Sequence, residues 1–144
     1  MSKAYSLADL KYISANTLRN WFRNGSPNGK FAVIDVRDED FIGGHIKGCL
    51  HYPAATFEET LPDLQLKLKQ NGIKDVVFHC ALSQVRGPSS TLKFLRANNE
   101  SNDDELKLLR VHVLKGGFTR WQQDYGEDSE VTEGFNKDLW RSTF

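Results

Sequence analysis

Short apolar runs alternate along the chain with longer segments in which apolar residues recur every three or four positions. The runs at residues 31–36 and 75–79 are nearly continuous in apolar character, as expected of strands that are buried on both faces of a parallel sheet. A third strand is predicted at residues 110–114, and two shorter ones at residues 12–13 and 49–52.

The segments between these strands have helical spacing. Ser14 is a typical N-cap residue, and Pro88 suits a first helical turn, where a missing N–H costs little. The predicted helices, with their buried apolar residues, are 15–23 (Leu18, Trp21, Phe22), a segment ending near Gly72 (Leu61, Leu64, Leu68), 88–96, and a segment after strand 110–114 (Phe118, Trp121, Tyr125). This alternation predicts an α/β fold, with a central parallel sheet flanked by helices.

The length of the chain favours a single domain. A chain of 144 residues can build one substantial core, so we expect one domain over residues 1–144, with its core at 10–126. Apolar residues in the tail at 127–144 favour packing on that core over an unattached partner-binding segment. These residues are Phe135, Leu139 and Trp140.

The charge balance narrows the choice of partners. The formal net charge is zero, which favours neither nucleic acid nor an acidic membrane surface. The acidic runs at residues 103–105 and 127–130 are predicted to be solvated loops. We find no secretory signal and no apolar run long enough to cross a membrane, and we expect the protein in the cytoplasm or the nucleus.

The two cysteines, Cys49 and Cys80, lie on separate segments without the spacing of a metal site or of a disulfide pair, which suits a reducing compartment. Cys49 falls on the predicted strand 49–52, so we do not expect it to act as a resolving thiol. His45 and His51 lack ligand partners at suitable spacing. No metal site is predicted.

Residues 79–87 read His-Cys-Ala-Leu-Ser-Gln-Val-Arg-Gly and carry the most distinctive chemistry of the chain. Cys80 is at the carboxyl end of the predicted strand 75–79, and a helix is predicted after the loop. In a strand–loop–helix unit, successive backbone N–H groups and the positive end of the helix dipole point at one place, where a tetrahedral oxyanion would fit. The same field favours the thiolate of Cys80, which is the nucleophilic form.

Arg86 can hold two anionic oxygens with its planar guanidinium group and neutralise charge in a transition state. We therefore predict Cys80 and Arg86 as catalytic residues. The predicted anion-binding loop comprises Ala81, Leu82, Ser83, Gln84, Val85, Arg86 and Gly87.

Single residues of this region also have structural interpretations. A free cysteine is usually a small core hydrophobe, so it is the whole pattern that favours catalysis by Cys80. Ser83 could donate a hydrogen bond to the sulfur or brace the loop. We assign His79 a supporting role in fixing the loop and the thiolate rather than that of a general base. Asp35 and Arg37 are expected to satisfy buried backbone and charged groups.

The segment from His79-Cys80 to Arg86-Gly87-Pro88 resembles the His-Cys-x5-Arg signature of cysteine-dependent phosphatases. It has the form found in M-phase-inducer phosphatases and in the related small eukaryotic arsenate reductases. Residues 33–37 with 43–48, and residues 113–121, resemble two markers of the rhodanese fold that these enzymes share. The resemblance spans residues 10–126 and implies a rhodanese-like domain.

This resemblance implies a phosphatase that hydrolyses phosphomonoesters, including phosphotyrosine or phosphothreonine proteins, through a phosphocysteine intermediate, without a metal or an organic cofactor. The alternative is an arsenate reductase that uses glutathione and glutaredoxin as its reductant. In both cases the loop binds an oxyanion, phosphate or arsenate.

Two further functions of the fold rank lower. Thiosulfate sulfurtransferases resemble this chain but have a loop one residue shorter, sized for a persulfide sulfur. Non-catalytic binding modules tend to lose the cysteine or the arginine, and both are present here. The M-phase-inducer loop has a glutamate just before its arginine, whereas Val85 stands there in this chain, so no acid for the leaving group is identified.

Overall fold

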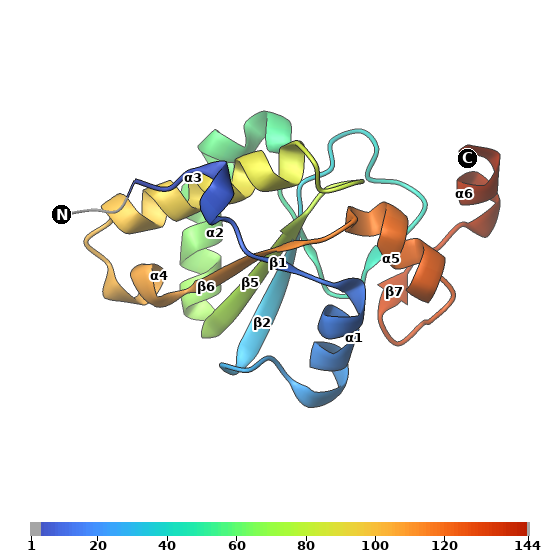
Figure 1. Ribbon diagram of the computed structural model, residues 1–144, viewed down its shortest axis with the longest axis horizontal. Coiled ribbons are helices and arrows are strands. Elements are labelled where there is room, and N and C mark those ends of the chain that lie inside the picture. The colour runs from blue at the N-terminus through green and yellow to red at the C-terminus, as the bar shows by residue number, and fades with distance from the viewer. Residues whose placement is uncertain (1–3, 144) are drawn as a thin grey trace.

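A computed structural model of the protein describes residues 4–143 (Figure 1). The predicted domain 1–144 also includes residues 1–3 and 144, which lie outside the described residues. A five-stranded sheet in the order β1-β6-β5-β2-β4 forms the centre, and all of its strand pairs are parallel. The strands of this sheet are Tyr12–Ile13 (β1), Lys30–Asp35 (β2), Leu50–His51 (β4), Ile73–His79 (β5) and Arg110–Leu114 (β6).

Helices cover both faces of the sheet, with α2 and α3 on one face and α1 and α5 on the other (Figure 1). The predicted α/β fold with a central parallel sheet is therefore confirmed. The α-helices are Ala15–Asn24 (α1), Phe57–Gln70 (α2), Arg86–Glu100 (α3), Asp104–Leu108 (α4), Gly117–Tyr125 (α5) and Lys137–Thr143 (α6), and 3-10 turns lie at Leu7–Asp9 and Ala54–Thr56.

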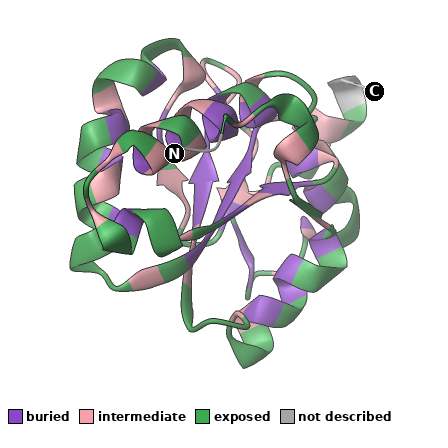
Figure 2. Ribbon diagram, turned by 60° about the vertical axis from the view of Figure 1, so that its left-hand side comes forward, coloured by how far each residue is buried: buried purple, intermediate pink, exposed green. Residues whose placement is uncertain are grey.

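The core has two layers because successive side chains of a strand point to opposite faces of the sheet. Ile34 and Phe78 pack with α2 and α3, whereas Val33 and Val77 pack with α1 and α5. Figure 2 shows the buried residues along the central strands and on the helix faces that meet them. The Ser14 side chain caps α1 as predicted, since its Oγ accepts a hydrogen bond from the Thr17 backbone N–H at 3.1 Å.

The acidic run at residues 127–130 is an exposed loop, as predicted, whereas the run at 103–105 is not a loop but caps and begins the helix α4. Asp103 is the N-cap of α4 and accepts hydrogen bonds from the backbone N–H groups of two residues in its first turn. Asp128 and Glu130 both bind Arg19 of α1, which is only 5% exposed, with N–O distances of 3.0 Å. Carboxylates stabilise a helix start through capping and through the helix dipole, and the second run anchors the C-terminal segment to α1.

The C-terminal segment folds back over the domain. Its strand β7 (Thr132–Glu133) pairs antiparallel with β3 (His45–Ile46), a small sheet that the sequence did not predict. The Nε1 of Trp140 on α6 donates a hydrogen bond to the backbone oxygen of Gly43 at 2.9 Å. No helix of residues 4–143 combines the length and the apolar character needed to cross a membrane.

Candidate active site

The predicted site residues lie together at the carboxyl edge of the parallel sheet. Cys80 follows the last residue of β5, and Arg86 is the first residue of α3. Ligand sites of open parallel sheets occur at this edge, where the loops after neighbouring strands meet. The loop from residue 80 to residue 86 connects the central strand β5 directly to a helix N-terminus.

The Cys80 sulfur lies inside the loop and is surrounded by backbone donors. Its Sγ accepts hydrogen bonds from the backbone N–H groups of Ser83 and Gly87, each at 3.2 Å. Cys80 is only 3% exposed, and a Cβ at position 87 would lie 3.5 Å from the sulfur. Two backbone donors of the loop therefore point at the buried sulfur.

Ser83 braces the loop rather than donating its hydroxyl to the sulfur. Its Oγ accepts a hydrogen bond from the Cys80 backbone N–H at 3.4 Å. Its φ of 55° is the only positive value at a non-glycine residue among the described residues. Such a conformation costs energy and is typical of functional loops that the surrounding structure holds in place.

Five further backbone N–H groups of the loop donate to no protein atom in the described part of the chain. Together with the dipole of α3 they form a donor-rich site for an anion. Leu82 and Val85 point outward and are 49% and 74% exposed. These unpaired donors belong to Ala81, Leu82, Gln84, Val85 and Arg86.

The first turn of helix α5 holds the loop from behind, because its backbone N–H groups donate to carbonyl oxygens of the loop. The backbone N–H groups of Phe118 and Thr119 donate to the oxygens of Cys80 and Ala81 at 3.0 and 2.9 Å. A Cβ at Gly117 would lie 2.4 Å from both of these oxygens, and its φ is +57°. Only glycine fits there, and because the carbonyls face α5, the N–H groups of the loop are left to face the anion.

His79 contacts the backbone of Cys80 rather than its sulfur. It is fully buried, and its Nδ1 lies 3.0 Å from the Cys80 carbonyl oxygen, which can only accept a hydrogen bond. Its Nε2 lies 3.6 Å from Asp35 Oδ2. Burial lowers the pKa of His79 in spite of the opposing effect of Asp35, so the ring is neutral at pH 7. This position suits the supporting role that we assigned to it.

Arg37 and Asp35 form a buried ion pair beside the site, in agreement with the structural role expected for them. Both side chains have no exposed surface, and the Arg37 NH2 lies 2.8 Å from Asp35 Oδ2. Burial by itself raises the pKa of Asp35, but the adjacent His79 ring, when it is protonated, and the hydrogen bonds and charge of Arg37 together hold that pKa below its ordinary value. The Arg37 NH2 also donates to the Gly44 oxygen at 2.9 Å, which fixes the segment 38–44.

Arg86 is already bound to two carboxylates of that segment. Its NH1 and NH2 donate to the two carboxylate oxygens of Asp40 at 2.7 and 2.6 Å, and its NH1 lies 3.3 Å from Asp38 Oδ2. Hydrogen bonds between them raise the pKa of Arg86 and lower the pKa of Asp40. The guanidinium group predicted to hold an anion is thus held by a carboxylate.

Asp38 and Asp40 were not singled out from the sequence. Their position in the sequence indicated where they lie, because both residues follow β2, and β2 is the parallel neighbour of β5. Residues that follow adjacent parallel strands meet at one edge of a sheet. The sequence therefore places the acidic segment near Cys80, although it does not show which carboxylate reaches Arg86.

Cys49 precedes β4 instead of lying on it, contrary to the strand predicted over residues 49–52. Burial raises its pKa to about 12, and a thiol with such a pKa is a poor nucleophile at neutral pH. Within residues 4–143 no cluster of three or more His, Cys, Asp or Glu side chains is placed to hold a metal ion.

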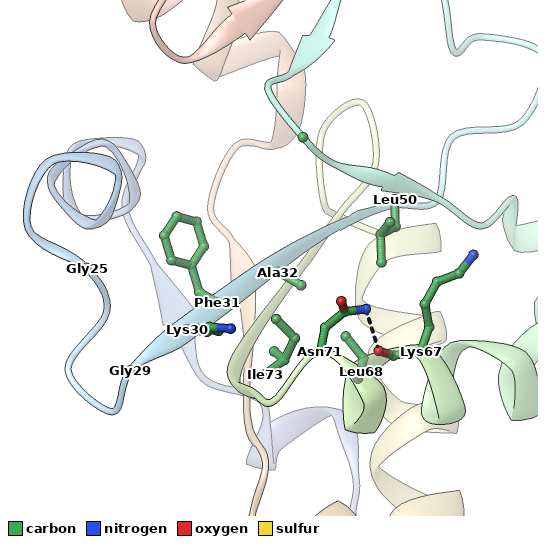
Figure 3. Close-up of a pocket in the computed structure, with 11 residues that line it drawn as sticks. Gly25, Gly29, Lys30, Phe31, Ala32, Leu50, Lys67, Leu68, Asn71 and Ile73 are labelled. Carbon is green, nitrogen blue, oxygen red and sulfur yellow. Dashed lines mark hydrogen bonds between the residues drawn. The ribbon is translucent and has the colours of Figure 1, made fainter.

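A hollow of about 620 Å³ lies at the opposite, amino-terminal ends of the strands (Figure 3). Its walls include Lys30 at the start of β2 and Ile73 at the start of β5, together with Lys67 of α2. None of the predicted site residues lines it. This hollow is therefore separate from the candidate active site at the carboxyl edge of the sheet.

Comparisons with known proteins agree with this architecture. A model of the rhodanese-like domain family matches residues 15–124. The chain is 40% identical over 149 residues to the CDC25-like phosphatase YCH1 of Saccharomyces cerevisiae, covering 96% of this chain and 99% of the relative. It is also 40% identical over 114 residues to Arsenate reductase 2.2 of Oryza sativa subsp. japonica, covering 78% and 82%.

Among solved structures, that of Saccharomyces cerevisiae Ygr203w is described as a homolog of single-domain rhodanese and of the Cdc25 phosphatase catalytic domain. It matches with a TM-score of 0.86 at 39% identity, covering 96% of this chain and 97% of that chain. The resemblance found in the sequence is confirmed, and the chain belongs to the rhodanese-like domain family, with phosphatases and arsenate reductases among its relatives.

Proposed function

We propose that this protein is a cysteine-dependent phosphatase that hydrolyses phosphomonoesters, including those of phosphoproteins, with Cys80 as the nucleophile. The observation that carries the proposal is the loop itself, in which backbone donors surround the buried sulfur and further N–H groups remain unpaired. Five residues separate Cys80 from Arg86, and this spacing suits a tetrahedral oxyanion better than a single sulfur atom.

In the first step the Cys80 thiolate attacks phosphorus, so that an S–P bond forms while the ester P–O bond breaks. The unpaired N–H groups of the loop stabilise the charge on the phosphoryl oxygens, and Arg86 joins them once it turns from Asp40 to the anion. Water then attacks phosphorus and the S–P bond breaks. Inorganic phosphate is released, and the Cys80 thiolate is regenerated. No residue of the chain is needed as a metal ligand.

The proton for the leaving group comes from water in this scheme. Val85 has no acidic group, and Asp40 is ionised as long as it is paired with Arg86, because that pairing lowers its pKa. Good leaving groups therefore depart readily and poor ones slowly. A reducing compartment, the cytoplasm or the nucleus, suits a reaction that depends on a free thiol.

Reduction of arsenate is the second candidate, and the similarity to Arsenate reductase 2.2 supports it. Here the Cys80 thiolate displaces hydroxide from arsenate and forms an S–As(V) bond. Glutathione, with glutaredoxin, then supplies two electrons as thiols are oxidised to a disulfide, and As(III) is released. A non-catalytic module and a thiosulfate sulfurtransferase remain lower in rank.

The three reactions can be ranked by measuring their turnover rates on one pure sample. The reactions are hydrolysis of p-nitrophenyl phosphate, glutathione-dependent reduction of arsenate, and transfer of sulfur from thiosulfate to cyanide. We expect hydrolysis to be the fastest and sulfur transfer to be negligible. Cys80→Ser should abolish turnover without unfolding the protein, because a serine hydroxyl is hardly ionised at neutral pH. Full activity of this variant, or dominant thiocyanate production, would overturn the proposal.

Arg86→Ala tests the second catalytic residue. It removes the only charged donor of the loop, so we expect both phosphate affinity and turnover to fall. Unchanged inhibition by inorganic phosphate would show that the backbone donors alone bind the anion.

A further inference from the structure

The hollow at the amino-terminal ends of the strands lies beside an open edge of the central sheet (Figure 3). On one side of β2, every residue from Lys30 to Asp35 pairs with β5. On the other side, β4 pairs with β2 only at Ile34 and Asp35. Within residues 4–143, no strand therefore pairs with residues 30–33 on that side, and an unpaired strand edge is a template for another extended chain.

The backbone of Phe31 faces this open side. In a parallel sheet, the N–H and C=O groups of successive residues point to alternate neighbouring strands. The Asp35 oxygen accepts a hydrogen bond from the Tyr52 N–H, which follows β4, at 3.0 Å. Four positions earlier, the backbone groups of Phe31 point to the same side, beyond the start of β4. The Phe31 ring packs against two aromatic rings of α1 at centroid distances of 5.7 and 5.2 Å, so it does not cover the edge.

The hollow combines an apolar floor with two cationic groups. Its volume is about 620 Å³, and no acidic residue is among its lining residues. The floor consists of apolar residues that belong to the core layer of α2, and the lysines Lys30 and Lys67 also line the hollow. The floor residues are Ala32, Leu50, Leu68 and Ile73.

Both lysines are available to an added carboxylate. Lys30 forms no ion pair with a carboxylate of the described residues. The Lys67 Nζ lies 3.8 Å from Asp63 Oδ2, in a pair whose side chains are 48% and 65% exposed, and such pairs contribute little to stability. A lysine at an open edge discourages pairing with neutral or basic strands, whereas an acidic segment is attracted to it.

We propose that this hollow is a docking site for an extended acidic segment of a partner protein, which adds to the open edge of β2 as a short strand. At about 3.3 Å per residue, the open stretch is on the order of 10 Å long and fits about three to five residues. Side chains of a strand alternate between two faces, so an apolar residue flanked at every other position by acidic ones meets the floor and the lysines together. Backbone hydrogen bonds supply affinity, and the side chains supply specificity.

The probe is the acetylated and amidated peptide Asp-Thr-Val-Thr-Glu, titrated into isotopically labelled protein while the backbone amide signals are followed by NMR. We expect the signals of Phe31 and Val33 to shift with a Kd of about 1 mM or lower, and the signal of Ser83 in the catalytic loop to stay in place. The comparison probes are the charge-reversed peptide Lys-Thr-Val-Thr-Lys and N-acetylglutamate. Absence of these shifts, or equal affinity for the charge-reversed peptide, would overturn the proposal. Equal affinity for N-acetylglutamate would show a site for a small carboxylate instead of a strand.

Charge-reversal variants test the role of the lysines. Lys30→Glu and Lys67→Glu should each raise the Kd of the acidic peptide about threefold to tenfold, and both should bind the charge-reversed peptide more tightly than the wild-type protein does. Lys107→Glu is the matched control, because this lysine is exposed on α4, and it should change neither Kd. Unchanged Kd values in Lys30→Glu and Lys67→Glu would refute docking at this hollow.

N-methylated peptides test the strand addition itself. Successive N–H groups of an extended peptide point to opposite sides, so a methyl group on the nitrogen of the central Val and one on that of the next Thr have different effects. Only the one that faces β2 should weaken binding, by about tenfold. Equal effects of the two methyl groups would show charge attraction without strand addition. Hydrolysis of p-nitrophenyl phosphate should be the same in all three lysine variants, so this test is independent of the proposed function.

Discussion

Replacing Asp40 with asparagine should strengthen the binding of inorganic phosphate, because Asp40 occupies the guanidinium group that the anion needs. Both terminal nitrogens of Arg86 donate to this carboxylate, at 2.7 and 2.6 Å. An anion that takes Arg86 as its partner must displace Asp40, so the free energy of the Arg86–Asp40 pair is subtracted from the binding free energy of the anion. Asparagine keeps the size of the side chain and removes its charge.

The size of the effect follows from the exposure of the pair. The Arg86 and Asp40 side chains are 32% and 43% exposed, and ion pairs at such positions contribute about 0.2–1 kcal/mol. At 1.4 kcal/mol for a factor of ten, this corresponds to a decrease in the Ki of phosphate of about 1.4-fold to 5-fold. The decrease should shrink at high ionic strength, since salt screens exposed pairs.

The assay is competitive inhibition of p-nitrophenyl phosphate hydrolysis by phosphate and by arsenate, at low and at high salt. Asp124→Asn is a matched control, because it breaks another exposed carboxylate–arginine pair, between Asp124 and Arg120 with an N–O distance of 2.9 Å. It should leave both Ki values unchanged. Weaker phosphate binding by Asp40→Asn would refute the reasoning and show that Asp40 positions Arg86 for the anion instead of competing with it.

Four other predictions concern the support of the site and its chemistry. Gly117→Ala should displace the loop, because the new Cβ would lie 2.4 Å from two loop carbonyl oxygens. We expect kcat/KM for p-nitrophenyl phosphate to fall tenfold or more, which corresponds to a loss on the order of 1.4 kcal/mol in transition-state stabilisation. A variant with the kcat/KM of the wild-type protein would contradict this prediction. Arg37→Leu should lower the free energy of unfolding in urea by about 3–5 kcal/mol, since it leaves Asp35 charged and buried; a loss below about 1 kcal/mol would mean that the pair is not needed. Burial lowers the pKa of His79 in the folded state. The contribution of the neutral ring to stability is therefore complete above the unfolded pKa of about 6.5 and is lost as the pH falls below that value. Urea titrations at several pH values should show that the free energy of unfolding of His79→Gln depends less on pH than that of the wild-type protein. With Val85 in place of an acid, kcat in a leaving-group series should fall steeply as the leaving-group pKa rises, and a flat dependence in the bond-breaking step would reveal a proton donor outside the loop.

The parts of the fold that the sequence predicted are those encoded locally. The apolar run before Cys80 predicts β5 because a strand buried on both faces needs apolar residues at every position. The helices that support the site were predicted within a few residues of their bounds because their apolar residues recur every three or four positions. The loop could be proposed as an anion site from the sequence because the residues that suggest it lie in one continuous segment, from Cys80 to Arg86.

What the sequence could not predict depends on contacts between distant segments. Asp40 reaches Arg86, 46 positions away in sequence, only because Arg37 is buried and holds the segment 38–44 against the catalytic loop. Two-residue strands such as β3 and β7, and a five-residue helix such as α4, are too short to show a hydrophobic period. These elements are defined by pairing and capping rather than by pattern.

The contact between Arg86 and Asp40 bears on both candidate reactions. Every oxyanion that recruits Arg86 must displace Asp40, whether it is the phosphoryl group of an ester or free arsenate. The Ki values of phosphate and of arsenate for the wild-type protein and for Asp40→Asn therefore measure the cost of this displacement in each reaction.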